Sequence, residues 1–199
     1  MTIIIPTYNE AQNLPTLFSR INQTVKTANI PCRIVVVDDD SPDKTWLTAL
    51  QLNRTYGNIA VLRRSSKMGL ASAIMDGLKY ANTPTIAVMD ADLQHPPELL
   101  PAMYKKILEG YRLVVASRYV ADGKIEGWSW TRKTVSRFAT FLTHLFLPQV
   151  RRVKDPLSGY FMFQKTILNN VNFNFANTGY KILLAFLVKA NHQNRIVEI

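Results

Sequence analysis

The chain has 199 residues, of which 47% are hydrophobic and 19% are charged, so it is long enough to bury the core of one domain. Its single cysteine, Cys32, excludes an internal disulfide, and its apolar segments are too short or too interrupted to cross a bilayer. The net charge of +10 favours an anionic partner, whether nucleic acid, nucleotide phosphates or an acidic membrane surface.

Apolar strands alternate with amphipathic helices through the first 117 residues. The pattern predicts strands at 2–6, 33–37, 59–62, 85–89 and 112–117, and helices at 11–27, 44–56, 69–81 and 97–109. Short loops join these elements, which predicts a Rossmann-like α/β domain with a mainly parallel sheet covered on both faces. In such sheets ligands bind at the carboxyl ends of the strands.

The second half is less regular. Residues 118–130 are predicted to form a loop, followed by a helix at 131–147, a strand at 157–163, a helix at 180–190 and a strand at 195–199. The helix at 131–147 has basic residues in its first half and recurring apolar residues throughout. It could lie at a membrane interface or pack in the core with solvated basic side chains, and the pattern alone slightly favours core packing.

Acidic residues follow three of the predicted strands. Glu10 comes after the first strand, Asp38, Asp39 and Asp40 after the second, and Asp90 and Asp92 after the fourth. A metal-bound diphosphate would explain carboxylates at this edge of a basic protein. The basic residues that could meet its phosphate oxygens are Arg63, Arg64, Lys67 and Arg118.

The segment from Asp90 to Gln94 is a candidate metal site. If the strand stays extended to this point, Asp90, Asp92 and Gln94 project to one side, because a strand alternates faces. Such hard oxygen donors favour Mg²⁺ or Mn²⁺ over zinc. A loop in which Asp90 caps a turn is the alternative for this motif taken alone.

A series of motifs runs along the chain in a recognisable order: PTYNE, VVVDDDSPD, GLASAIMDGLKYA, MDADLQHPPE, ASRY, GWSWTRKTVSR, DPLSGYF and GYKILL. In this order the chain resembles the dolichyl-phosphate or polyprenyl-phosphate mannosyltransferases of glycosyltransferase family 2, over essentially all 199 residues. The resemblance implies a single GT-A domain spanning 1–199, with a nucleotide-sugar-binding half at 1–117 and an acceptor-binding half at 118–199.

The resemblance also implies the site residues by position. The nucleotide would be bound by Pro6, Tyr8, Glu10, Val37, Asp39, Asp90 and Ala91, with Asp39 and Glu10 meeting the base and ribose. The metal ligands would be Asp90, Asp92 and Gln94, the catalytic residues Asp92 and Arg118, and the acceptor-phosphate residues Arg118, Arg132 and Ser136.

The activity implied is an inverting, Mg²⁺- or Mn²⁺-dependent transfer of a hexose, in first place mannose from GDP-mannose, to a polyprenyl or dolichyl phosphate. The protein would act peripherally at the cytoplasmic face of a membrane. A phosphate monoester has a second pKa of about 6, so the acceptor is largely dianionic and has little need of a general base. His95 is then expected to buttress the metal motif. A UDP-sugar donor, such as UDP-glucose, stays open because the motifs do not identify the base.

Three departures from the family pattern point to an alternative. Ala71 stands where the family usually has glycine, and Ala185 where it often has glutamate. The chain also ends at Ile199, before a basic segment and membrane helices of many relatives, so its C-terminus is expected to be truncated. The alternative is therefore a catalytically impaired, nucleotide-binding, membrane-associated protein. Binding to nucleic acid is not expected, because it explains the charge but not the strand-end acids.

Overall fold

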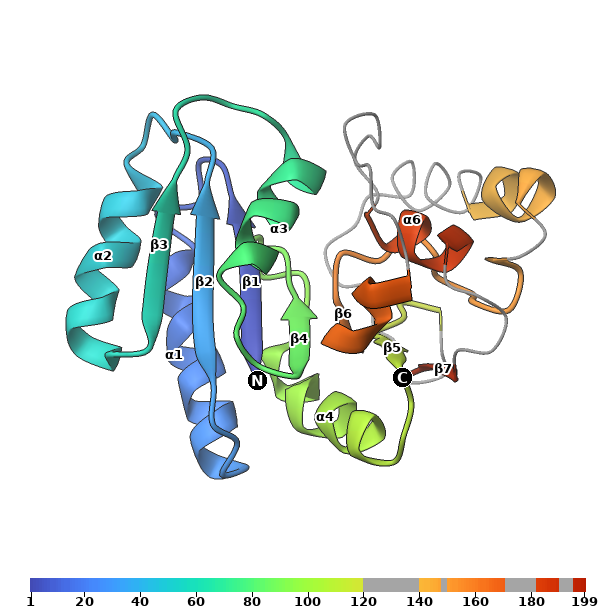
Figure 1. The fold of residues 1–199 in the computed structure, drawn as a ribbon. Helices are drawn as coiled ribbons and strands as arrows, with labels where there is room; N and C mark the ends of the chain where they lie inside the picture. Colours follow the sequence, from blue (N-terminus) through green and yellow to red (C-terminus); the bar gives the residue numbers. More distant parts are fainter. Residues whose placement is uncertain (120–139, 148–149, 171–181, 190–194) are drawn as a thin grey trace.

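The computed structural model describes residues 1–119, 140–147, 150–170, 182–189 and 195–199. These residues form a seven-stranded sheet, with the strand order β3-β2-β1-β4-β6-β5-β7, and helices lie on both of its faces (Figure 1). The predicted α/β class with a mainly parallel sheet is confirmed.

Four parallel strands build the first half of the sheet: β1 (Thr2–Thr7), β2 (Arg33–Asp38), β3 (Ile59–Arg63) and β4 (Thr85–Val88). Ile4 of β1 pairs with Val35 of β2 and with Val88 of β4. The side chains of β1 and β4 are all buried, which is typical of a parallel sheet covered on both faces. Because the four strands run the same way, their carboxyl ends meet at one edge, the upper one in Figure 1.

Three short strands complete the sheet: β5 (Leu113–Val115), β6 (Phe161–Gln164) and β7 (Ile196–Glu198). Strand β6 runs antiparallel between β4 and β5, and its first residue, Phe161, pairs with Val88 and with Val115. Strand β7 is parallel to β5, with Glu198 opposite Val115. The loop before Phe161 and the residue Glu198 therefore reach the same edge at which β4 and β5 end.

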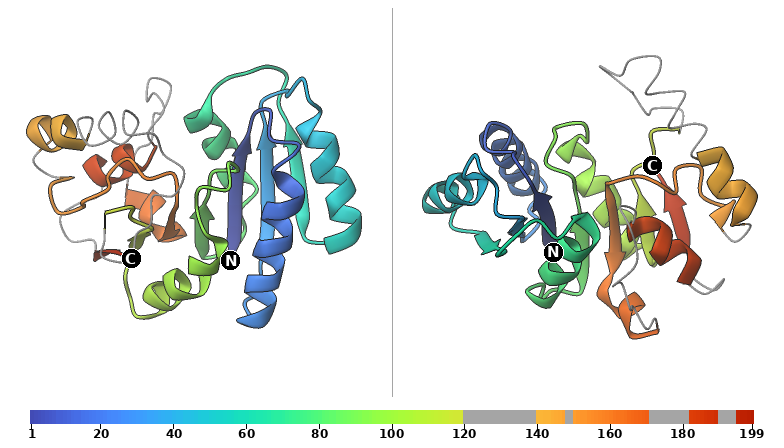
Figure 2. Two further views of the ribbon diagram at one scale, coloured as in Figure 1. Left: turned by 180° about the vertical axis from the view of Figure 1, so that it is seen from behind. Right: turned by 90° about the horizontal axis from the view of Figure 1, so that it is seen from above.

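The helices cover the two faces separately, as the views in Figure 2 show. One face carries α1 (Leu14–Thr27), α2 (Thr45–Tyr56), the 3₁₀ helix η1 (Pro97–Leu99) and α4 (Leu100–Leu108), and the other carries α3 (Leu70–Lys79) and α6 (Ile182–Lys189). The alternation of β1 sets this division. Ile3 and Ile5 pack with Phe18 of α1, whereas Ile4 packs with Ile74 of α3.

The boundaries of the predicted elements shift by a few residues. Helix α1 begins at Leu14 rather than at residue 11, because the carbonyl of Glu10 accepts the N–H groups of Asn13 (3.0 Å) and Leu14 (3.2 Å) in a turn. Strand β6 begins at Phe161 rather than at residue 157, because residues 155–160 form a loop. The 3₁₀ helix η3 (Lys165–Asn170) was not predicted.

Only the last part of the predicted helix at 131–147 lies within the described residues. Residues 140–146 are helical, and Phe141, Leu145 and Phe146 are 60%, 51% and 74% exposed. The slight preference for a core-packing helix is therefore wrong for these three apolar side chains. Within the described ranges, no helix has the length and hydropathy that crossing a bilayer requires.

Candidate functional site

The loops that follow β1 and β2 are fastened to each other. Three consecutive backbone N–H groups, those of residues 9 to 11, donate to Ser41 Oγ (3.0 Å), Thr45 Oγ1 (2.9 Å) and Asp43 Oδ2 (3.0 Å). These bonds hold Glu10 at the edge of the sheet, directly after β1.

Asp38 and Asp43 serve this loop structure. Asp38 is fully buried and accepts hydrogen bonds from Thr7 Oγ1 (2.9 Å), the Ser41 N–H (2.9 Å) and Ser41 Oγ (2.6 Å). Burial acts to raise the pKa of Asp43, but its hydrogen bonds to Thr45 and to the N–H of Ala11 outweigh this and lower the pKa. Both carboxylates thus stabilise the loops that follow β1 and β2 through hydrogen bonds within the protein.

Asp39, predicted to bind the nucleotide, also has protein partners. It is 5% exposed; its Oδ1 accepts Arg64 Nη1 (2.7 Å), and its Oδ2 accepts the N–H groups of Met68 (3.1 Å) and Gly69 (2.8 Å). The Arg64 Nη2 donates in turn to Ser72 Oγ on α3 (2.7 Å). The Asp39–Arg64 pair therefore ties the end of β2 to the beginning of α3, and a role of Asp39 toward base or ribose stays a prediction.

The remaining predicted nucleotide residues of the first half lie at the ends of β1 and β2. Pro6 and Val37 are buried and opposite each other in the sheet, whereas Tyr8 is 37% exposed. Lys67 Nζ lies 3.7 Å from the centroid of that ring, a cation–π contact. An aromatic ring and a cation thus adjoin at this rim, and nucleotide binding by Tyr8 stays a prediction.

The segment after β4 does not continue as a strand. Strand conformation ends at Val88, Leu93 has a φ of +61°, and the N–H of Gln94 donates to Asp92 Oδ1 (3.1 Å). The condition under which strand alternation would place Asp90, Asp92 and Gln94 on one side is therefore not met. Ala91 is 3% exposed and Gln94 is exposed, and metal binding by Gln94 stays a prediction.

Carboxylates of the first and fourth strand ends approach each other here. Burial raises the pKa of Glu10, and the negative charges of Asp92 and Asp43 raise it further, against the opposing hydrogen bond from Asn13. The charge of Asp92 reaches Glu10 only because the two loops converge. The structure thus brings together acids that lie 82 residues apart in the chain.

Arg118 stands at the end of β5, beside a buried partner. Its Nε and Nη2 donate to Asp155 Oδ2 (2.8 Å) and Oδ1 (2.7 Å), and Asp155 is fully buried. Burial acts to lower the pKa of Arg118, but the hydrogen bonds and charge of Asp155 outweigh it and raise the pKa, and the charge of Asp90 acts in the same direction. The negative charge of Asp90 is therefore close enough to act on Arg118.

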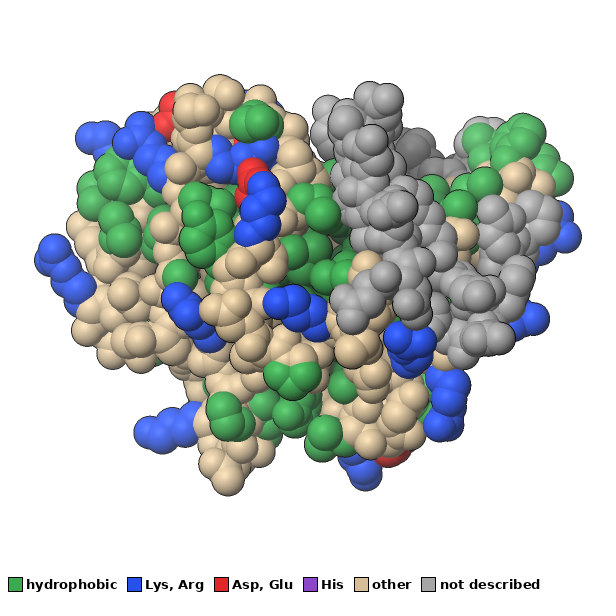
Figure 3. All heavy atoms as spheres, viewed as in Figure 1, with side chains coloured by type: hydrophobic (Ala, Val, Ile, Leu, Met, Phe, Trp, Pro, Cys, Tyr) green, Lys and Arg blue, Asp and Glu red, His purple; other side chains and the backbone are tan. Residues whose placement is uncertain are grey.

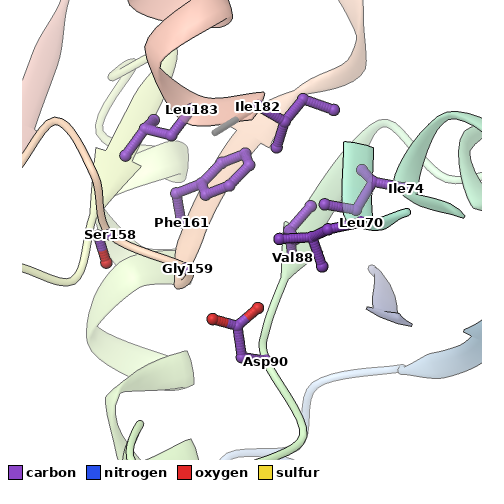
Figure 4. A pocket seen from close by; sticks show the side chains of 9 residues that line it. All are labelled: Leu70, Ile74, Val88, Asp90, Ser158, Gly159, Phe161, Ile182 and Leu183. Atoms are coloured by element: carbon purple, nitrogen blue, oxygen red, sulfur yellow. The ribbon is translucent and has the colours of Figure 1, made fainter. Parts of the chain in front are cut away.

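A small hollow lies beside Asp90 (Figure 4). Its lining residues are Leu70, Ile74, Val88, Asp90, Ser158, Gly159, Phe161, Ile182 and Leu183. The carboxylate of Asp90 is flanked by Gly159 and by His95, whose Nε2 lies 3.9 Å from Asp90 Oδ2. The His95 ring is buried against Tyr160, with centroids 5.5 Å apart, which fits the expected buttressing role.

The donor set fits a magnesium or manganese ion. Within the described part of the chain, no three or more His, Cys, Asp or Glu side chains are grouped so that they could hold a metal. Two carboxylates, Asp90 and Asp92, are what these ions commonly take from a protein, because phosphates and water complete the coordination shell. Structural zinc would need a closed set of four ligands.

Replacing Gly159 by alanine is expected to damage this site. A Cβ at Gly159 would overlap the Asp90 carboxylate, so Asp90 must move, and disturbing the surroundings of a metal ligand typically reduces metal affinity by about 10- to 100-fold. The measurement is Mn²⁺ affinity in the presence of nucleotide. Gly57→Ala is the control, because Gly57 has a φ of +72° but nothing within 4 Å, so it should lose stability alone. Unchanged Mn²⁺ affinity in Gly159→Ala would contradict this geometry.

Comparison with known proteins decides the family. Residues 2–171 match the family model described as glycosyl transferase family 2. The chain belongs to glycosyltransferase family 2. It is 43% identical over 199 residues to a dolichol-phosphate mannosyltransferase of Pyrococcus furiosus, covering 100% of this chain and 55% of the relative. A dolichol-phosphate mannosyltransferase of Mycosarcoma maydis is 29% identical over 204 residues, covering 100% of this chain and 68% of the relative. The chain thus spans about half of the archaeal relative's length.

Solved structures of similar fold are also glycosyltransferases. A mannosyltransferase from Pyrobaculum calidifontis in complex with GDP-Man and Mn²⁺ superposes with a TM-score of 0.70 at 18% identity, covering 100% of this chain and 54% of that one. Glucosyl-3-phosphoglycerate synthase from Mycobacterium tuberculosis, in complex with Mn²⁺, UDP-glucose and phosphoglyceric acid, gives 0.74 at 19% identity, covering 99% and 68%. The family 2 chain therefore has the predicted GT-A fold.

Two predicted acceptor residues of the family 2 chain, Arg132 and Ser136, lie outside the described residues. The sequence alone gave no role to Asp155, Gly159 or Glu198. The first two belong to the DPLSGYF motif, which could have drawn attention to them. Glu198 carries no local signal, because its partners lie more than 40 residues away.

Proposed function

We propose that this chain transfers a hexose to a polyprenyl phosphate. The leading candidate for the donor is GDP-mannose, which would supply mannose. The observation that carries the proposal is the 43% identity over the whole chain to a dolichol-phosphate mannosyltransferase. It is supported by the acidic loops that meet at the strand ends, with Glu10 close enough to Asp92 for its pKa to respond.

Asp90 and Asp92 would hold the divalent cation, which when bound supplies charge stabilisation to the departing diphosphate. A phosphate oxygen of the acceptor would attack the anomeric carbon while the bond from that carbon to the diphosphate breaks, so the anomeric centre inverts. The acceptor needs little deprotonation because its second pKa is about 6. Arg118 would contribute charge near the phosphates, and His95 would keep Asp90 in place.

The direct test is incubation of the chain with GDP-mannose, Mg²⁺ or Mn²⁺ and a polyprenyl phosphate, followed by mass spectrometry of the extracted lipid. We expect a lipid-linked hexose that disappears when EDTA removes the cation. If a lipid-linked hexose forms from UDP-glucose but not from GDP-mannose, the donor is a UDP-sugar. Binding of GDP with no product from any donor would favour the catalytically impaired alternative, which Ala71 and Ala185 suggest.

We further propose that the protein acts peripherally at the cytoplasmic face of a membrane. The support is an exposed apolar group on residues 140–146, formed by Phe141, Leu145 and Phe146, close in sequence to the exposed Arg151 and Arg152. Basic side chains are also spread over the face in Figure 3, where acidic ones are few. Apolar side chains beside cations are typical of a surface that binds anionic lipids.

Phe146→Ser is therefore expected to weaken binding to vesicles that contain phosphatidylglycerol. Burying a phenylalanine contributes about 2 kcal/mol, so the affinity should fall at least about tenfold. Vesicle flotation measures this. Leu108→Ser is the matched control, because Leu108 is 71% exposed at the end of α4. Equal binding of both variants would argue against this surface.

A further inference from the structure

The loop from Asp155 to Gly159 connects two parts of the proposed active site. At its first residue, Asp155 accepts three hydrogen bonds from Arg118: the backbone N–H to Oδ2 (3.1 Å), Nε to Oδ2 (2.8 Å) and Nη2 to Oδ1 (2.7 Å). At its last residue, Gly159 lies so close to the Asp90 carboxylate that a Cβ there would displace it. Arg118 and Asp90 are therefore located by opposite ends of one five-residue loop.

The loop is fixed to the end of β5 in its middle. Ser158 Oγ is buried and donates to the carbonyl of Ala116 (2.8 Å), and the N–H of Ser158 lies 3.3 Å from the carbonyl of Asp155. These bonds hold the second half of the loop. The N–H groups of Lys154 and Asp155, where the loop begins, lie outside any strand or helix.

Glu198 of β7 holds the first half. Its Oε2 accepts the N–H of Lys154 (2.8 Å), and its Oε1 accepts the N–H of Asp155 (2.9 Å). The backbone on both sides of Glu198 is held. Val197 pairs with Val114 of β5, and the Ile199 N–H donates to the carbonyl of Val115 (3.0 Å) while the Ile199 carbonyl accepts the N–H of Ser117 (2.8 Å). One carboxylate on a strand paired with β5 thus accepts two consecutive backbone N–H groups at the start of the loop.

We propose that Glu198 and Asp155 are positioning residues that orient Arg118 toward the phosphates at the site of hexose transfer. The inference rests on the proposed function for what Arg118 does there, but not for how it is held. Arginine is a long side chain with many rotamers, and its planar fork is ordered by a bidentate carboxylate. Glu198 fixes the backbone of Asp155, and Asp155 fixes the guanidinium. The C-terminal strand thereby takes part in building the site.

The test compares Glu198→Gln and Asp155→Asn with the wild type. A glutamine at 198 keeps only one acceptor oxygen for two N–H groups, and an asparagine at 155 loses the charge that pairs with Arg118. Removing groups that orient metal ligands typically reduces affinity or activity by about 10- to 100-fold, and we expect the lower end of this range for groups that orient Arg118. We expect the KM for a short polyprenyl phosphate to rise about tenfold or more in each variant, while GDP affinity measured with Mn²⁺ stays that of the wild type.

Glu109→Gln is the control, because Glu109 forms an exposed ion pair with Lys106 beyond the end of α4. Its kinetic constants should be those of the wild type. Wild-type acceptor KM in Glu198→Gln would overturn the proposal. So would a parallel loss of GDP affinity and thermal stability, since a merely structural role would affect both.

A second readout does not depend on transfer activity. The Nε–H of Arg118, bonded to a buried carboxylate, should give a slowly exchanging ¹⁵N NMR signal, assigned by its absence in Arg118→Lys. We expect this signal to broaden or vanish in Glu198→Gln, and its persistence unchanged would overturn the proposal. If the wild type transfers no hexose, the proposed function fails while this measurement still decides how Arg118 is positioned.

Discussion

Asp92→Asn is expected to abolish hexose transfer. The substitution removes one of the two carboxylate charges that would hold the cation, while keeping the size of the side chain. Loss of charge stabilisation worth about 4 kcal/mol corresponds to a rate decrease on the order of 1000-fold. The measurement is the rate of lipid-linked hexose formation, together with Mn²⁺ affinity in the presence of GDP.

The same variant should not lose stability. The charge of Asp92 raises the pKa of Glu10, so the ionised carboxylates repel each other, and an asparagine removes that repulsion. The free energy of unfolding at neutral pH is therefore expected to stay the same or increase. Glu98→Gln is the control, because it changes one charge close by in the sequence and only breaks an exposed ion pair with Arg20. Retained transfer in Asp92→Asn would remove Asp92 from the metal site.

Arg64→Met is expected to give a large loss of stability. Arg64 and Asp39 have side chains that are only 4% and 6% exposed, and methionine would leave the Asp39 charge buried with two backbone N–H groups and no cation. Breaking a buried pair by removing one partner decreases the free energy of unfolding by about 3–5 kcal/mol. Domains of this kind have about 5–15 kcal/mol in total. Urea denaturation measures the change.

Two further variants sharpen this result. Arg63→Met should reduce stability by less than about 1 kcal/mol, because the Arg63–Asp40 pair is exposed. The double variant Asp39→Asn, Arg64→Met should recover part of the lost stability, because no uncompensated charge remains. A small loss in Arg64→Met, equal to that of Arg63→Met, would mean that the two backbone N–H groups alone stabilise Asp39.

Helices and strands, the sheet class and the edge that carries the site could be predicted from the sequence. Helices and strands leave patterns that are visible within a few consecutive residues. Examples are the apolar runs of β1 and β2 and the helical spacing of Leu14, Leu17 and Ile21. The rule that parallel strands present their carboxyl ends together then located Glu10, Asp39 and Asp90 at one edge. Burial and strand pairing agree with that reasoning.

What each acid does at that edge was decided by the tertiary structure. Asp38, Asp39 and Asp43 look alike in the sequence. In the structure, Asp38 and Asp43 accept hydrogen bonds within the loops, whereas Asp39 pairs with Arg64 and binds the start of α3. Asp155, Gly159 and Glu198 matter because of contacts across 37 to 69 residues of chain. A carboxylate is free for a ligand only if the folded protein leaves its oxygens unused, and that depends on which distant donors the packing brings within 3 Å.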